Sequence, residues 1–85
     1  MAYEVRIRRT ALNYLNKVDS NPYRRLATAI EGLIEIPPAG DIRPLKGRAG
    51  VYRLRVGSFR ILFRIDHLKE LIFVDAIGSR GVIYN

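Results

Sequence analysis

A chain of 85 residues that is 48% hydrophobic is long enough for one small domain over residues 1–85 and too apolar to be disordered. It has no cysteine and one histidine, which excludes disulfides and cysteine-ligated zinc and argues against a histidine metal centre, so we expect no metal and no other cofactor. The sequence has no 18-residue apolar run and no signal-peptide core, so the protein is expected in the cytoplasm and away from membranes. Its net charge of +7 favours an anionic partner.

The N-terminal part predicts a strand followed by a short helix. Residues 3–8 alternate apolar and charged side chains, which is typical of a half-buried strand. Residues 10–18 then place apolar side chains at helical spacing: Ala11, Leu12, Leu15 and Val18. Thr10 is a candidate N-cap for this helix, because its hydroxyl can accept a hydrogen bond from an unpaired backbone N–H.

A second helix is predicted to begin near residue 20. Ser20 or Asn21 can cap it, and Pro22 then falls in the first turn, where its missing N–H does no harm. An apolar stripe follows at helical spacing: Leu26, Ile30, Leu33 and Ile34. Pro37 and Pro38 cannot continue the helix and therefore end it. The tight join between the two helices predicts a helical hairpin.

A β-hairpin is predicted over residues 51–65, after a loop at residues 39–50 that holds three glycines and one proline. Gly57 and Ser58 suit a two-residue hairpin turn. Such a turn pairs six apolar residues on one face: Val56 with Phe59, Leu54 with Ile61, and Tyr52 with Phe63. A slip of one residue would send them to the other face, so the apolar pattern supports this register.

The last predicted strand is nearly continuous in its apolar character. Residues 66–69 make a turn, and residues 70–77 are apolar apart from a few positions, Asp75 among them, which indicates a central strand covered on both faces. The element order is β-α-α-β-β-β. We therefore expect an α+β fold in which the helical hairpin packs on a small, twisted, mainly antiparallel sheet.

The other face of the predicted hairpin is basic and carries Arg53, Arg55, Arg60 and Arg64. Arg55 lies opposite Arg60 in this register, and like charges in that position destabilise a sheet by up to about 1 kcal/mol. Two structural explanations are open: the guanidiniums can reach into water, or acids such as Asp75 or Glu35 can neutralise them. The alternative is an anion site, because a planar, permanently charged guanidinium binds phosphate through two hydrogen bonds.

The charge is unevenly distributed along the chain. Residues 1–42 hold six basic and five acidic side chains, whereas residues 43–85 hold nine and three. This asymmetry indicates a polyanionic partner, although a merely basic soluble protein would also show it. The basic face of the hairpin could be extended by three further residues: Lys46, Arg48 and Arg80. Carboxylates are few near these residues, so neither a His/Glu acid–base nuclease nor a carboxylate-metal nuclease is expected.

Three segments resemble the RelE/ParE superfamily of bacterial and archaeal type II toxins. RPLKG at residues 43–47 is similar to the family's PLKG-like segment, and YRLRVGSFRILF at residues 52–63 resembles its Y-R-[IL]-R-x-G-x-[YF]-R-[IL]-x-[YF] hairpin. IGSRGVIY at residues 77–84 is similar to the terminal I-G-H-R-x-x-[IV]-Y. Their mutual spacing matches as well, and the resemblance spans the whole chain in element order, which implies a RelE-like fold.

The resemblance implies a RelE-type toxin, a metal-independent endoribonuclease that cleaves messenger RNA in the ribosomal A site and inhibits translation. The catalytic residues implied by position are Arg60, Arg80 and Tyr84. Arg60 would stabilise the charge on the scissile phosphate, with Arg80 in the same role or as general acid, and Tyr84 would activate the ribose 2′-OH or stack on a base. The candidate RNA-binding residues are Arg53, Arg55, Lys46 and Arg48.

Two residues depart from the family pattern. Ser79 stands where many members have histidine, and Arg43 stands where some relatives have a catalytic glutamate. Neither a histidine nor a glutamate general acid–base is therefore expected at these positions, which leaves a site made of arginines and a tyrosine.

The resemblance also implies partners and alternatives. We expect a RelB-like antitoxin in a heterodimer or heterotetramer, the ribosome and messenger RNA as targets, and operator DNA bound only through the antitoxin. A ParE-like toxin shares the fold but binds DNA gyrase, and such chains tend to lack the complete Arg/Arg/Tyr set. An inactive relative that only binds its antitoxin is the third reading.

Overall fold

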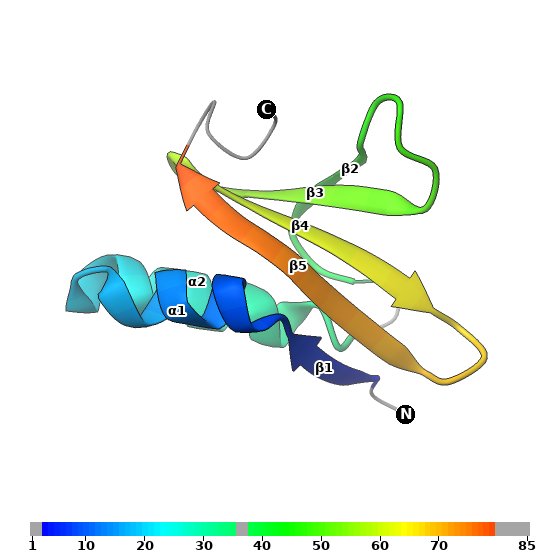
Figure 1. The fold of residues 1–85 in the computed structure, drawn as a ribbon, viewed down its shortest axis with the longest axis horizontal. Coiled ribbons are helices and arrows are strands. Elements are labelled where there is room, and N and C mark those ends of the chain that lie inside the picture. The colour runs from blue at the N-terminus through cyan, green and yellow to red at the C-terminus, as the bar shows by residue number, and fades with distance from the viewer. Residues whose placement is uncertain (1–2, 36–37, 80–85) are drawn as a thin grey trace.

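The computed structural model describes residues 3–35 and 38–79, and within them it forms one five-stranded sheet and two helices (Figure 1). The elements, in chain order, are β1 (Glu4–Ile7), α1 (Arg9–Lys17), α2 (Ser20–Gly32), β2 (Asp41–Pro44), β3 (Val51–Val56), β4 (Phe59–Asp66) and β5 (Leu71–Ser79). The strand order across the sheet is β1-β5-β4-β3-β2. Only the β1–β5 pairing is parallel, so the expected α+β fold with a mainly antiparallel sheet is confirmed.

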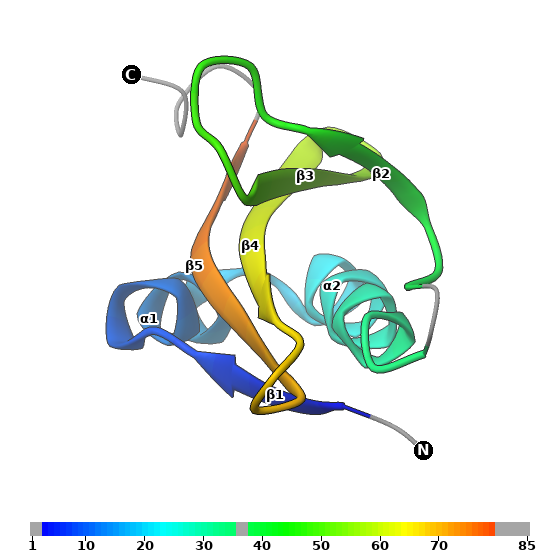
Figure 2. The same ribbon diagram turned by 90° about the vertical axis from the view of Figure 1, so that its right-hand side faces the viewer.

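Both helices cover the same face of the twisted sheet, with α1 against β5 and α2 against β3 (Figure 2). The core between the layers consists of Ala11, Leu15, Leu26, Ile30, Leu33, Leu54, Ile61, Phe63, Ile72, Val74 and Ile77. Both helices supply apolar side chains at helical spacing, and the strands supply every second residue. In residues 3–35 and 38–79 no helix lies on the opposite face of the sheet, and we call that face the open face.

The β3–β4 hairpin has the predicted register. Val56 pairs with Phe59, Leu54 with Ile61 and Tyr52 with Phe63, and the rings of Tyr52 and Phe63 stack with centroids 5.6 Å apart. Gly57 has a φ of 59°, which the first central position of a type II′ turn requires. The hairpin is therefore fixed both by its apolar face and by its turn.

The predicted helix caps are wrong. α1 begins at Arg9, so Thr10 lies inside the helix, and the N-cap is Arg8, which makes no side-chain capping bond. α2 begins at Ser20 after Asp19, which also makes no side-chain capping bond. The chain enters both helices directly from extended backbone, and helix formation here depends on apolar packing rather than on a capping side chain. Pro22 does lie in the first turn of α2, as predicted.

The loop predicted at residues 39–50 contains a strand that sequence analysis missed. β2 pairs antiparallel with β3, with Asp41 opposite Arg55 and Arg43 opposite Arg53. It is short, lies at the sheet edge and half-buries only one side chain, Ile42, so it shows no apolar alternation. Pro44 is tolerated there because an edge strand does not need every backbone N–H for the ladder.

β5 is flanked on both sides by other strands, as predicted for a central strand. Its register shifts by one residue against β4, since Leu62 pairs with Ala76 while Phe63 pairs with Val74. Asp75 is the extra residue of this bulge. The shift explains how a charged residue interrupts an apolar strand without entering the core.

Candidate nucleic-acid interface

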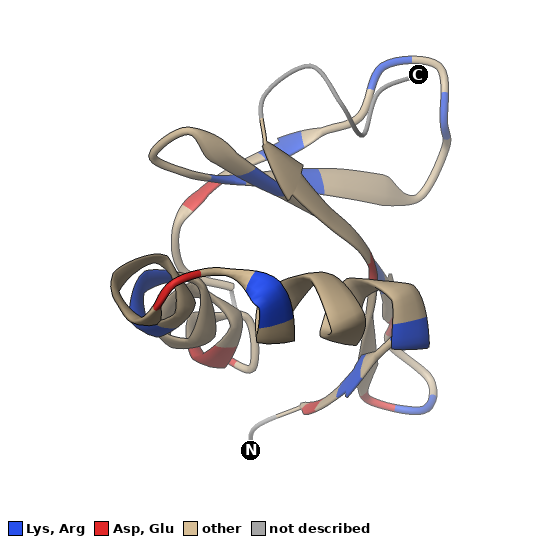
Figure 3. Ribbon diagram, turned by 60° about the vertical axis from the view of Figure 1, so that its left-hand side comes forward, with Lys and Arg blue, Asp and Glu red and all other residues tan. Residues whose placement is uncertain are grey.

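The open face gathers the predicted arginines through strand alternation. In β3, Arg53 and Arg55 point away from the helices, because Leu54 between them belongs to the core. In β4, Arg60 shares this face and lies directly opposite Arg55, as the sequence predicted. Basic positions accordingly follow the β2–β3–β4 part of the sheet (Figure 3).

Two of these arginines are buried, although no helix covers them. Arg53 and Arg60 are each 8% exposed, whereas Arg55 is exposed. Arg60 pairs with Gly78 of β5 on its other side, and glycine leaves room for a long side chain to lie along the sheet. No buried side-chain nitrogen or oxygen in the described residues lacks a hydrogen-bond partner. Most of the surface of Arg53 and Arg60 is therefore packed against the protein, and a guanidinium nitrogen of Arg53 lies 3.9 Å from the Asp41 carboxylate.

Asp41 is an acid inside the basic face, and sequence analysis missed it together with β2. Its carboxylate lies 3.9 Å from a guanidinium nitrogen of Arg53, 3.9 Å from Arg55 and 4.0 Å from Arg43. These distances exceed hydrogen-bond range, so the contacts are electrostatic. No sequence signal could have found it, because β2 half-buries a single side chain, Ile42, and so shows no alternation. Within the described residues Asp41 is the carboxylate that Arg43, Arg53 and Arg55 share, so these three guanidiniums together keep a net positive charge.

A pocket of this basic face lies at the β3–β4 turn. It has a volume of about 350 Å³ and is lined by Arg55, Gly57, Ser58 and Arg60. Its lining combines two guanidiniums with backbone and hydroxyl donors, which is the chemistry that binds phosphate oxygens. We call this the hairpin pocket.

The loop residues Lys46 and Arg48 are exposed but do not join the hairpin pocket. They precede Val51, at the opposite end of β3 from Arg55, about 13 Å away along the strand. The structure therefore does not bring these two predicted RNA-binding residues together with Arg55 and Arg60. Two other predicted site residues, Arg80 and Tyr84, lie outside the described residues.

Arg64, the fourth arginine of the hairpin, has a structural partner. It donates two hydrogen bonds to Asp75, of 2.6 and 3.0 Å, and this hydrogen bonding raises the pKa of the Arg64 guanidinium above its ordinary value. Neutralisation by Asp75, one of the two structural explanations for the basic face, thus holds for Arg64. It does not hold for Arg53 and Arg55, whose nearby acid is Asp41.

Comparison with known proteins identifies the family. The family model of the ParE toxin of the type II toxin–antitoxin system parDE matches residues 5–84. The chain belongs to the RelE/ParE superfamily of type II toxins. Toxin RelG of Mycobacterium tuberculosis is 33% identical over 88 residues, which is 99% of this chain and 98% of that protein.

Solved structures of RelE/ParE toxins share the fold. The archaeal RelE–RelB complex from Pyrococcus horikoshii gives a TM-score of 0.82 at 24% identity, covering 96% of this chain and 99% of that chain. The RelBE2 toxin–antitoxin complex of Mycobacterium tuberculosis gives 0.80 at 26% identity, covering 94% and 100%. The isolated Escherichia coli RelE toxin gives 0.79 at 22% identity, covering 98% and 92%.

Neither helix in residues 3–35 and 38–79 is long and apolar enough to span a membrane. In the same part of the chain, no three His, Cys, Asp or Glu side chains are placed to hold a metal ion.

Proposed function

We propose that this type II toxin is a ribosome-dependent, metal-independent endoribonuclease that cleaves messenger RNA in the A site and so inhibits translation. The observation that carries the proposal is the Arg55–Arg60 pair at the hairpin pocket. Both guanidiniums line the same pocket, and a pair of planar, permanently charged guanidiniums can bind one phosphate through several hydrogen bonds. Arg53 supports the pair from the neighbouring position of β3.

The proposed chemistry is an internal displacement. The ribose 2′-OH attacks the adjacent phosphorus, the bond to the leaving 5′ oxygen breaks, and negative charge grows on the non-bridging oxygens. Arg60 would stabilise that charge, while Arg53 and Arg55 hold the neighbouring phosphates. We assign Tyr84 to activation of the 2′-OH and Arg80 to charge stabilisation or to protonation of the leaving oxygen.

The proposed partner is a RelB-like antitoxin. Several structural neighbours are toxin–antitoxin complexes, among them the RelE–RelB complexes from Pyrococcus horikoshii and Methanococcus jannaschii. An antitoxin with an acidic helical segment would complement the basic open face and hold the toxin inactive in a heterodimer or heterotetramer. Operator DNA would then be contacted through the antitoxin.

The test is cleavage of a message on programmed ribosomes, with 3′ ends mapped by primer extension. The parent protein should cut within A-site codons, and Arg60→Ala should reduce the rate by at least about 100-fold, as expected for loss of a charge-stabilising donor. Arg24→Ala, which removes an exposed charge from α2, is the matched control and should cut normally. Because Arg60 is buried, Arg60→Lys and a thermal unfolding curve separate lost chemistry from lost folding.

A second function has its own support, because the matching family model is that of a ParE toxin. If the antitoxin-free parent leaves the message intact but inhibits DNA gyrase supercoiling, the gyrase-binding function replaces the ribonuclease. If it does neither and still binds a RelB-like antitoxin, the chain is an inactive relative.

A further inference from the structure

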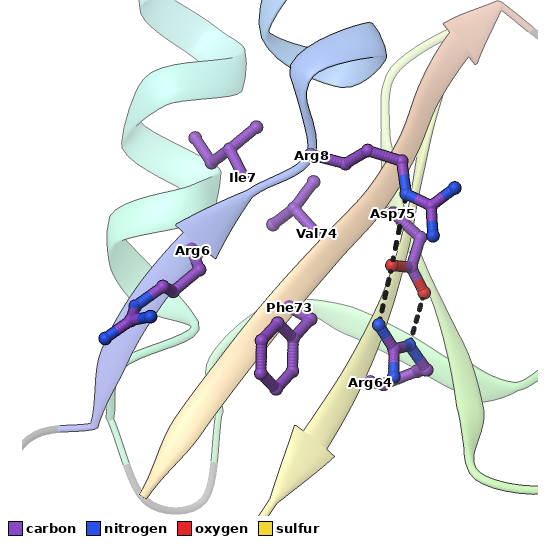
Figure 4. Close-up of a pocket in the computed structure, with 7 residues that line it drawn as sticks. All are labelled: Arg6, Ile7, Arg8, Arg64, Phe73, Val74 and Asp75. Carbon is purple, nitrogen blue, oxygen red and sulfur yellow. Dashed lines mark hydrogen bonds and ion pairs between the residues drawn. The ribbon is translucent and has the colours of Figure 1, made fainter.

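A second pocket on the open face lies at the β1 side of the sheet, away from the hairpin pocket (Figure 4). It has a volume of about 290 Å³ and is lined by Arg6, Ile7, Arg8, Arg64, Phe73, Val74 and Asp75. In β5, Phe73 is flanked by an arginine on each neighbouring strand, since it pairs with Arg6 of β1 and Arg64 of β4. We call this the Arg–Phe pocket.

The charges in the Arg–Phe pocket are only partly offset. Asp75 accepts both of its hydrogen bonds from Arg64, and its side chain is 16% exposed. Arg8 reaches the same carboxylate only at 3.9 Å and makes no side-chain hydrogen bond within the described residues. Its side chain is 63% exposed, so the donors of Arg8 face solvent at the rim of the pocket. A guanidinium in this position can bind an incoming anion without breaking an existing hydrogen bond.

The aromatic ring indicates what kind of anion would fit. Phe73 is half-buried on the open face, and the guanidinium carbon of Arg64 lies 4.9 Å from its ring centroid. Figure 4 shows the ring beside β5, with Arg6 on one side and Arg8, Arg64 and Asp75 on the other. A ring next to fixed guanidiniums is the combination that binds a nucleobase by stacking and its phosphate by charge. An acidic peptide would use the arginines but would gain little from the ring.

We propose that the Arg–Phe pocket binds one unstacked nucleotide of a single-stranded RNA, with its phosphate on Arg8 and its base against Phe73 and Arg64. This inference extends the proposed function and rests on it, because the proposed function is what identifies the bound polymer as RNA. Arg60 and Arg64 lie on the same face of β4, about 13 Å apart. A short single-stranded segment can cover that distance, so the pocket would hold the RNA outside the cleavage site and fix its direction across the sheet.

The experiment measures RNA binding without ribosomes. Fluorescence anisotropy is recorded for a labelled octauridylate and for an abasic strand of the same length. Phe73→Leu, which removes the ring, should weaken octauridylate binding about five-fold or more and leave the abasic strand unchanged. Arg8→Gln should weaken both strands and reduce the slope of log affinity against log salt by about 0.7. Arg24→Gln, the same charge change on exposed α2 and away from the pocket, is the control and should leave both affinities and the slope unchanged.

Two features of the variants separate a loss of RNA binding from a loss of folding. Arg8 is exposed and makes no side-chain hydrogen bond within the described residues, so Arg8→Gln should keep its fold even if Phe73→Leu does not. Phe73→Tyr keeps a ring and should bind octauridylate like the parent. A thermal unfolding curve for each variant shows which binding values refer to a folded protein.

Several outcomes would overturn the proposal. It fails if the parent does not bind octauridylate. It also fails if folded Phe73→Leu binds both strands as the parent does, because charge alone would then account for binding. It also fails if polyglutamate binds in an Arg8-dependent manner and RNA does not, which would make the pocket a protein-docking site. If the parent cleaves A-site codons normally but neither Phe73→Leu nor Arg8→Gln changes RNA binding, the pocket does not bind RNA and the proposed function stands. If RNA binding depends on the Phe73 ring but the parent does not cleave the message, the pocket binds RNA and the proposed function is wrong.

Discussion

Asp41 gives the basic face an internal anion. It lies within 4.0 Å of Arg43, Arg53 and Arg55 without reaching hydrogen-bond distance of any of them. A carboxylate at such a distance lowers the positive potential that a phosphate would meet, and it keeps the guanidiniums from repelling one another. These two effects have opposite consequences for RNA binding, and a single substitution separates them.

We expect Asp41→Asn to bind octauridylate about three- to five-fold more tightly at low salt, because one opposing charge near three guanidiniums is removed. The gain should shrink as salt is added. Titration of the parent and the variant at two salt concentrations measures it. Glu31→Gln, which removes an exposed acid from α2, is the charge-matched control and should gain less. Weaker binding by Asp41→Asn would instead mean that Asp41 mainly positions the arginines.

Asp75 has a different role, since it joins β4, β5 and the start of α1 through Arg64 and Arg8. Asp75→Asn leaves two arginines close together without their shared carboxylate, so the free energy of unfolding should fall by about 1–2 kcal/mol. Urea denaturation measures this loss. Glu4→Gln, which breaks an ion pair whose side chains are 61% and 66% exposed, should change stability by less than about 0.5 kcal/mol. Equal losses in the two variants would contradict this assignment.

At the scale of elements, the β3–β4 hairpin depends on its turn. Gly57 has a φ of 59°, a region that residues with a Cβ enter at a cost of about 1–2 kcal/mol. A Cβ there would also touch the guanidinium of Arg25, but that flexible side chain can move. Gly57→Ala should therefore lower the free energy of unfolding by about 1–2 kcal/mol, while Ser58→Ala should have little effect. Chemical denaturation of both variants checks this, and a neutral Gly57→Ala would exclude the type II′ turn.

The elements that sequence reasoning predicted are those with a strong apolar period. The register of the hairpin followed from six paired apolar residues, and both helices followed from stripes that enter the core. β2 was missed because an exposed edge strand buries almost nothing, so its pairing with β3 leaves no periodic trace. The caps were misassigned because Thr10 and Ser20 are good capping residues in isolation, whereas packing decided where the helices begin.

The same reasoning explains which parts of the candidate site could be predicted. Arg53, Arg55 and Arg60 were placed correctly because strand alternation alone decides their face. Lys46 and Arg48 were grouped with them on charge, and the position of the loop at the far end of β3 separates them. Asp41 could not be found while its strand was unknown. The Arg–Phe pocket joins residues from β1, β4 and β5, which no local pattern brings together.

At the scale of the whole molecule, charge and layers are segregated. The helices cover one face of the sheet (Figure 2), and strand alternation places the arginines of β2, β3 and β4 on the other. In the sequence, nine of the fifteen Lys and Arg residues fall in residues 43–85. Such a surface attracts a polyanion from any direction on that side.

This arrangement predicts strongly salt-dependent RNA binding. Neutralisation of phosphates by Arg43, Arg53, Arg55 and Arg60 should give a slope of about −3 in log affinity against log salt. Participation of Arg6 and Arg8 should steepen it to about −4. Anisotropy titrations over a range of salt concentrations measure the slope, with the Arg53→Gln, Arg55→Gln double variant as a reference that should be shallower by about 1.4. A slope near zero would show that the open face does not contact the phosphates.

The parallel pairing of β1 with β5 has a consequence for how the protein is made. Glu4 pairs with Leu71, so among the described strands the first in chain order, β1, has the last, β5, as its sheet partner. β1 and β5 also close the core around α1, which packs on β5. A nascent chain therefore cannot complete this fold until its C-terminal strand has emerged, and the long-range pairing slows the final step. The five-stranded sheet that carries the arginine surface is therefore complete only once Leu71–Ser79 has left the ribosome.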